Sequence, residues 1–321
     1  MHSRRLPAGA AAAVSALLLL AGCGSGSSST TTTGTSTPSS SSSSGGGGVV
    51  TISGQNFSPE AVIVADLYAG VLKKAGYTPH VKLVGTRDIY MKVFPKSVDV
   101  VPEYVGGILE FLNGTYNGAN AKPVTLSDPA KSIADAKSLL KKAGITLLDP
   151  SPAADANAFF VSKAYADQNH VATLSDLKGK SVVLAAAPDC KGRVDCEGGL
   201  RSAYGIDITK ILGLGYASQQ TYDSVLHGES QLGETSTTDG TLQSQGLVLL
   251  TDDKHIQPAE NLVPAVSSSF LAAHPDVAAP LNALMAALTT EKLTELNAKV
   301  AVDREKPQAV ADQFLADAGL S

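Results

Sequence analysis

From residue 49 onward, short runs of β-type residues alternate with stretches whose apolar residues recur at helical spacing, and this alternation limits the folds open to the chain. A strand is expected over 49–54, followed by a helix. Ser58 can cap the start of this helix, Pro59 suits its first turn, and Gly76 can end it. Further strands are expected over 80–84 and 98–102, and helices over 86–96, 104–113 and 127–143. A βαβαβ beginning predicts parallel strands joined by right-handed crossovers, with a binding site at their carboxyl ends.

A second α/β unit follows the break at Asp149-Pro150-Ser151-Pro152. Strands are expected over 158–162 and 181–185, and the alternation continues to about residue 250. We therefore expect two α/β lobes, joined by crossovers near residues 150 and 250, with a ligand cleft between them that closes by a hinge motion. Lobe 1 is expected to comprise residues 49–152 plus 248–321, and lobe 2 the inserted residues 153–247.

The first residues read as an export signal. Arg4 and Arg5 precede an apolar run over 10–21 that is too short to span a bilayer, and the run ends at Cys23 in a sequence that resembles a bacterial lipobox. We expect a signal peptide over 1–22 and a lipid on Cys23, although an ordinary signal peptide with an incidental cysteine stays open. The Ser/Thr/Gly-rich residues 23–48 predict a flexible tether, and both a leash and a mere spacer are consistent with this sequence.

The net charge and the cysteine content limit the kinds of partner and site that the chain can have. The net charge is -5 with no cluster of Lys or Arg, which argues against nucleic acid. Besides Cys23 the chain has Cys190 and Cys196, which in an exported protein favour a disulfide over a redox or metal site. No catalytic motif, cofactor loop or paired-histidine zinc motif is present, so we expect neither an enzyme nor a metal or cofactor.

Several segments, in this order, resemble the glycine betaine/choline/carnitine-binding (osmoprotectant) proteins of ABC importers. The pattern D-x-x-P-E-Y-x-G occurs at residues 99–106. Further matches lie at 54–58, 173–177, 237–240, 249–254, 296–297 and 310–315. The resemblance implies a type II-like periplasmic-binding-protein fold, a separate membrane permease with its ATPase, and a monomer that is lipid-anchored outside the cytoplasmic membrane.

Members of that family hold quaternary ammonium groups in a cage of tyrosines, because aromatic faces attract a cation that has no hydrogen-bond donor. The resemblance places Tyr104 in this cage and Phe159 at a second ring position. It also places Gln55, Asn157 and Arg193 at polar positions, with Arg193 available for a ligand carboxylate.

Two cage positions depart from the family pattern. Ser236 and Glu260 stand where the family supplies a third and a fourth tyrosine, and Thr238 follows Ser236 in the same segment. The loss of two rings predicts weaker binding of a methylammonium group, which Glu260 could offset by its charge. Three alternatives remain at this point: a non-betaine ligand in a diverged cleft, an extracellular enzyme on the same fold, and a lipoprotein that makes only protein contacts.

Overall fold

The structure is a computed structural model that describes residues 47–321. The expected signal peptide over 1–22, the lipidation of Cys23 and the tether up to residue 46 lie outside the described residues. None of the helices in the described part of the chain combines the length and the apolar character needed to cross a bilayer.

The first sheet has five strands in the order β2-β1-β3-β10-β4. The first three pair in parallel, while β10 runs antiparallel to both β3 and β4. Its strands are β1 (Val49–Gln55), β2 (Thr78–Val84), β3 (Val100–Tyr104), β4 (Ile145–Leu147) and β10 (Leu262–Ser267). Its helices are α1 (Pro59–Lys74), α2 (Arg87–Met91), α3 (Val105–Asn117), α4 (Pro129–Asp135), α5 (Lys137–Ala143), α10 (Ser268–Ala273), α11 (Ala278–Ala287), α12 (Thr290–Ala301) and α13 (Pro307–Asp317), with a 3-10 turn η2 (Pro275–Val277).

The second sheet repeats this arrangement in the order β7-β6-β8-β5-β9. Here β7, β6 and β8 are parallel, and β5 is antiparallel to both β8 and β9. Its strands are β5 (Asn157–Ser162), β6 (Ser181–Ala186), β7 (Asp207–Gly213), β8 (Leu232–Ser236) and β9 (Leu247–Leu250). Its helices are α6 (Lys163–Asn169), α7 (Glu197–Ser202), α8 (Gln219–Leu226), α9 (Leu242–Gln245) and the 3-10 turn η1 (Leu174–Leu177).

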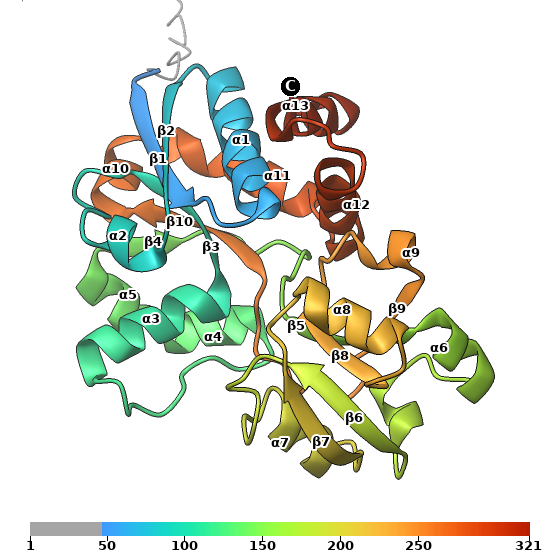
Figure 1. Ribbon diagram of the computed structural model, residues 1–321. Helices are drawn as coiled ribbons and strands as arrows, with labels where there is room; N and C mark the ends of the chain where they lie inside the picture. Colours follow the sequence, from blue (N-terminus) through green and yellow to red (C-terminus); the bar gives the residue numbers. More distant parts are fainter. Residues whose placement is uncertain (1–46) are drawn as a thin grey trace, which may run out of the picture. The chain divides into compact units, whose positions relative to one another are not determined.

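Each sheet with its helices forms one lobe, so the expected two-lobe α/β fold is confirmed (Figure 1). In each lobe the strand that runs antiparallel, β10 or β5, directly follows a crossover from the other lobe. The two crossover segments lie beside each other, since Ala154 and Asn261 form an antiparallel bridge and the Asp155 amide donates to the Glu260 carbonyl at 3.0 Å.

Two expectations about boundaries need correction. The predicted return to lobe 1 after residue 247 cuts through β9, whose Leu247–Leu250 pair with β5 in the second sheet, so the return lies after residue 250. The helix expected over 127–143 is two helices, because the chain turns at Ala136 between α4 and α5. By contrast, α1 begins where Ser58 caps it and ends just before Gly76, whose φ of 93° requires glycine.

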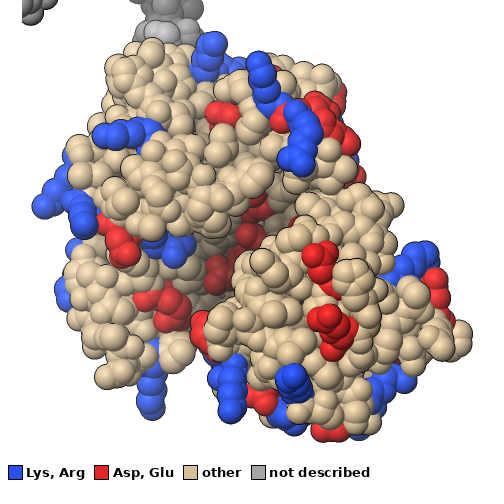
Figure 2. Space-filling model, in the orientation of Figure 1, with Lys and Arg blue, Asp and Glu red and all other residues tan. Residues whose placement is uncertain are grey.

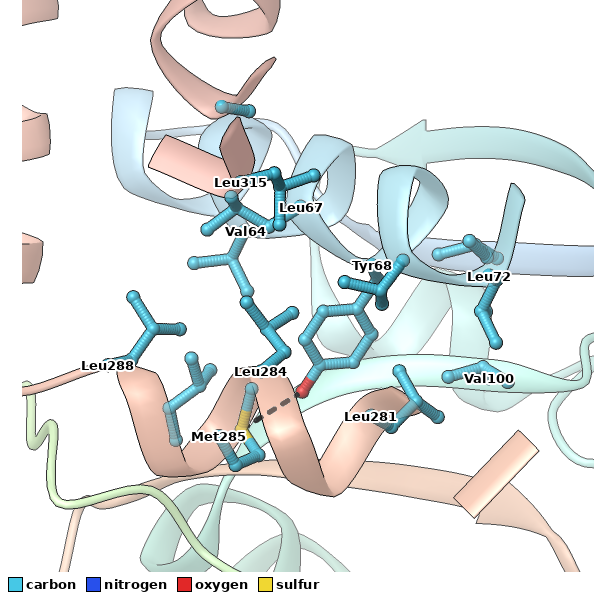
Figure 3. Close-up of a cluster of buried hydrophobic side chains, with 14 of the residues drawn as sticks. Val64, Leu67, Tyr68, Leu72, Val100, Leu281, Leu284, Met285, Leu288 and Leu315 are labelled. Carbon is cyan, nitrogen blue, oxygen red and sulfur yellow. Dashed lines mark hydrogen bonds between the residues drawn. The ribbon is translucent and has the colours of Figure 1, made fainter. Parts of the chain in front are cut away.

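The core of lobe 1 holds α1 against α11, α12 and α13 (Figure 1). Figure 3 shows the ring of Tyr68 pointing from α1 toward α11, where its hydroxyl lies 3.7 Å from the Met285 sulfur. This packing fixes the position of α12, which also contacts lobe 2 through the turn that follows β8.

Candidate ligand-binding cleft

A cavity of about 430 Å³ lies where parallel strands of both lobes end. Its walls come from the β1–α1 loop and α12 in lobe 1, and from the β7–α8 loop and the turn after β8 in lobe 2. Figure 2 shows the molecule hollowed on this face, with Asp and Glu side chains on the walls of the hollow. Its volume lies within the range typical of small-molecule sites.

Glu60 connects the two lobes at this cavity. One carboxylate oxygen accepts a hydrogen bond from the Tyr104 hydroxyl, and the other accepts from Asn297 Nδ2 at 2.6 Å. The same Asn297 nitrogen donates to the Thr238 carbonyl in lobe 2 at 2.9 Å. Thr238 Oγ1 in turn donates to Asp155 Oδ1 at 2.9 Å, so a continuous hydrogen-bonded chain runs from β3 to the first crossover.

The two acids of this network influence each other. Burial raises the pKa of Glu60 to about 7, and the charge of Asp155 adds to the rise. Burial likewise raises the pKa of Asp155, while its hydrogen bond from Thr238 opposes the shift. Because like charges at a buried site disfavour double ionisation, a cation bound beside them would stabilise the ionised pair.

Tyr104 lies beside this network rather than on the cavity wall. Its ring packs against the lobe 1 core, and its hydroxyl is bound to Glu60. Burial, followed by the charge of Glu60, raises the pKa of its phenol well above the usual value. The assignment of Tyr104 to a ligand cage therefore stays a prediction, and in this structure the residue orients Glu60.

Glu260 belongs to the return crossover and contacts the first turn of α3. Its Oε2 accepts from the Gly107 amide at 3.2 Å, and a Cβ on Gly106 would meet its Oε1 at 2.3 Å. Burial raises the pKa of Glu260 to about 7. It lines a second cavity of about 450 Å³ together with Asn157 and Phe159. The walls of this cavity come from the two crossovers, from β5 and β9 of lobe 2, and from the start of α12 in lobe 1.

The remaining predicted residues fall in several places. Phe159 is 1% exposed and packs in the core of lobe 2, which differs from the expected cage ring. Arg193 is held by Asp195, to which Nη2 and Nε donate at 2.6 and 3.0 Å, so it is not free for a ligand carboxylate. Asn157 donates to the same Asp195 at 3.0 Å. Gln55 is half-buried at the end of β1.

Of the eight predicted ligand residues, Ser236 and Thr238 line the cavity between the lobes. Their hydroxyl oxygens lie 3.3 Å apart. The residues that sequence analysis missed are Glu60, Asp155, Asn297, Phe57 and Tyr216, all of which line this cavity. Phe57 lies within the resembling segment at 54–58 and Glu60 lies two residues after it, so that segment carried a usable signal. Asn297 lies in the resembling segment at 296–297, which was not assigned to the site, and Asp155 and Tyr216 lie outside every resembling segment.

Cys190 and Cys196 form a disulfide, as predicted, and both are fully buried in the lobe 2 core. Glu234 lies beside them, and its Oε2 accepts from the Ala187 amide at 2.7 Å. Because both sulfurs are bonded to each other, neither is a thiolate available to a metal.

Replacing both cysteines by alanine is expected to lower the free energy of unfolding by about 2 to 3 kcal/mol, since a cross-link over so short a loop removes entropy from the unfolded chain. Urea unfolding of the double variant, beside the oxidised and the reduced wild-type protein, measures this loss. The reduced wild-type protein should have the same free energy of unfolding as the variant. If the free energies of unfolding of the oxidised wild-type protein and the variant differ by less than about 0.5 kcal/mol, the expected role of the disulfide is contradicted.

Solved structures share the two-lobe architecture of the chain. A crystal structure described as a glycine betaine/carnitine/choline ABC transporter superposes with a TM-score of 0.72 at 22% identity, over 84% of this chain and 99% of that chain. The unliganded structure of YehZ from Escherichia coli gives a TM-score of 0.69 at 23% identity, over 85% and 99%. This likeness establishes the type II periplasmic-binding-protein fold.

The sequence comparison identifies the family. Residues 48–317 match the model of the substrate-binding domain of ABC-type glycine betaine transport systems, so the chain belongs to this family. The glycine-betaine-binding protein of Pseudomonas aeruginosa is 27% identical over 277 residues, covering 82% of this chain and 86% of that protein. The Escherichia coli protein YehZ, a glycine betaine-binding protein, is 24% identical over 279 residues, covering 83% and 90%. The family binds solutes for membrane permeases and is not a family of enzymes, as the sequence predicted.

Proposed function

We propose that this chain is the extracytoplasmic solute-binding subunit of an ABC importer and that it takes a quaternary-ammonium osmoprotectant or a related small cation. Family membership supports the transport role. The observation that carries the choice of cargo is the cavity between the lobes, where the carboxyl groups of Glu60 and Asp155 line the wall and a bound cation would stabilise their ionised, negatively charged forms. A small organic cation is the ligand that this charge favours.

Capture would proceed by closure of the two lobes on the solute. The cavity draws its walls from both lobes, so a bound solute contacts both only when they are together, and this difference in contacts shifts the population toward the closed form. The proposal includes a lipid on Cys23, the tether over 23–48, a monomeric protein and a permease partner whose ATPase is a separate chain. In this proposal, lobe 1 and lobe 2 are the two bodies that move relative to each other when the cleft closes.

Thermal-shift and calorimetric titration of the purified protein tests this proposal. The panel comprises glycine betaine, choline, carnitine, ergothioneine, amino acids and polyphenols. At least one methylammonium compound is expected to bind, and at a concentration 100 times its Kd it would stabilise the folded protein by about 2.7 kcal/mol. Amino acids without a methylated ammonium serve as the control group. Binding of none of the methylammonium compounds would overturn the assigned cargo class.

A further inference from the structure

Two exposed aromatic residues line the cavity between the lobes, one from each lobe. Phe57, in the β1–α1 loop of lobe 1, is 71% exposed, and Tyr216, in the β7–α8 loop of lobe 2, is 43% exposed. Exposed aromatic side chains at a cavity that also contains carboxylates are the combination that attracts an organic cation. These rings occupy sequence positions different from the two cage tyrosines that Ser236 and Glu260 replace.

The rest of the cavity wall is acidic and contains no base. Among the described residues, the cavity is lined by Glu60, Asp155 and Asp239 and by no Lys, Arg or His. Asp239 is already saturated by hydroxyl groups of lobe 2, which leaves Glu60 and Asp155 to face a cation. Asp155 accepts its hydrogen bond through Oδ1.

Two arginines outside the cavity do not compensate for this absence, because each is already paired with an acid. Arg87 forms an ion pair with Glu103 at 2.9 Å, and Arg193 is held by Asp195. A ligand carboxylate in this cavity would therefore meet negative charge with no cation to pair with it, at a site where burial strengthens the repulsion.

One acceptor of the cavity wall lacks a donor. Both bonds of Asn297 Nδ2 go to acceptors, Glu60 Oε2 and the Thr238 carbonyl, which fixes the orientation of the amide. Its Oδ1 is buried and has no hydrogen-bond partner within residues 47–321. An unpaired buried acceptor is costly, and a hydroxyl on the ligand would supply the missing donor.

We propose that this cavity binds a net-cationic amino alcohol of the choline type, with its ammonium group between Phe57 and Tyr216, and that it discriminates against zwitterions such as glycine betaine. The inference rests on the proposed function and narrows its substrate class. Choline and glycine betaine carry the same trimethylammonium group and differ at the other end, where one has a hydroxyl and the other a carboxylate. The pair therefore isolates the contribution of the acidic wall.

Calorimetric titration of the purified protein with choline and with glycine betaine at pH 8 tests the inference. Choline is expected to bind at least about tenfold more tightly than glycine betaine. Phe57→Ala and Tyr216→Ala are each expected to weaken choline binding by about 3- to 30-fold, the span of one cation–π contact. Tyr116→Ala serves as the matched control, because the ring of Tyr116 on α3 contacts the ammonium group of Lys142 on α5 and does not line the cavity.

Asp155→Asn supplies a readout that a loss of folding cannot imitate. Removal of this charge should weaken the binding of choline and strengthen the binding of glycine betaine. The ratio of choline affinity to glycine betaine affinity should therefore fall by about tenfold. If the wild-type protein binds glycine betaine as tightly as choline or more tightly, the inference is overturned. Unchanged choline affinity in both aromatic variants also overturns it. Either result leaves the proposed function standing. If no methylammonium compound of the panel binds, the proposed function fails and the inference fails with it.

Discussion

Glu60→Gln is expected to raise the free energy of unfolding of the unliganded protein at pH 8 by on the order of 2 kcal/mol, and to change it little at pH 5. Burial raises the pKa of Glu60 to about 7 from an ordinary 4.5, so the folded protein holds a proton that the unfolded chain releases. The stability due to this proton is fully present below pH 4.5 and is lost as the pH rises through 7.

The size of the effect follows from the shift. A difference between 4.5 and about 7 corresponds to roughly 3 kcal/mol at pH 8, because each pKa unit is worth about 1.4 kcal/mol. Glutamine imitates the protonated acid but cannot accept from Asn297 with its amide nitrogen, which costs about 1 kcal/mol for one hydrogen bond. The difference between these two contributions, on the order of 2 kcal/mol, is the expected gain in the free energy of unfolding.

Urea unfolding of the wild-type protein and of Glu60→Gln between pH 5 and pH 8 measures this gain in stability. Glu110→Gln is the matched control of opposite sign, because hydrogen bonds from the Val124 and Thr125 amides lower the pKa of Glu110 despite its partial burial. That control should be less stable than wild type at pH 8. A Glu60→Gln protein whose stability follows that of wild type at every pH would show that Glu60 is ionised in the fold at no cost.

Gly240→Ala is expected to weaken choline binding by about 10- to 100-fold while both lobes remain folded. A Cβ at position 240 would lie 2.4 Å from the Ala298 nitrogen and 2.7 Å from the Thr294 carbonyl oxygen. Both atoms belong to the backbone of α12, which cannot yield as a flexible side chain would. The added methyl group therefore pushes the turn after β8 away from α12, breaks the contact of Asn297 with Thr238 and opens the cavity.

Calorimetry with choline, together with urea unfolding of the same samples, separates this loss of affinity from a loss of folding. Gly114→Ala is the matched control, since a Cβ at position 114 meets nothing within 4 Å. It should bind like wild type. Wild-type affinity in Gly240→Ala would mean that the contact between α12 and the turn after β8 has no part in binding.

Local sequence patterns predicted the elements better than their pairing. Ser58, Pro59 and Gly76 bounded α1 correctly, because capping and backbone conformation are local properties. The antiparallel placement of β5 and β10 could not be read from their sequences, since it depends on which lobe the chain has just left. The misplaced boundary inside β9 has the same origin, because its pairing partner β5 lies about 90 residues earlier.

The site was predicted less completely than the fold. Glu60 and Asn297 come from α1 and α12, and the packing of these helices brings them together. Asp155 comes from a crossover and joins them through Thr238 of lobe 2. Phe159 matched a cage position by its ring, yet both faces of β5 are covered in lobe 2, and Phe159 packs in one core cluster while Phe160 packs in another. The resemblance named the family correctly, whereas the chemistry of a diverged cleft required the three-dimensional arrangement.

A crystal structure of the protein grown with choline tests most directly whether a cationic solute is held between the two lobes. The ammonium group is expected between the rings of Phe57 and Tyr216, beside Asp155, with the choline hydroxyl directed toward Asn297 Oδ1. Choline bound in the cavity lined by Glu260 and Asn157, or against the lobe 1 surface alone, would contradict the account.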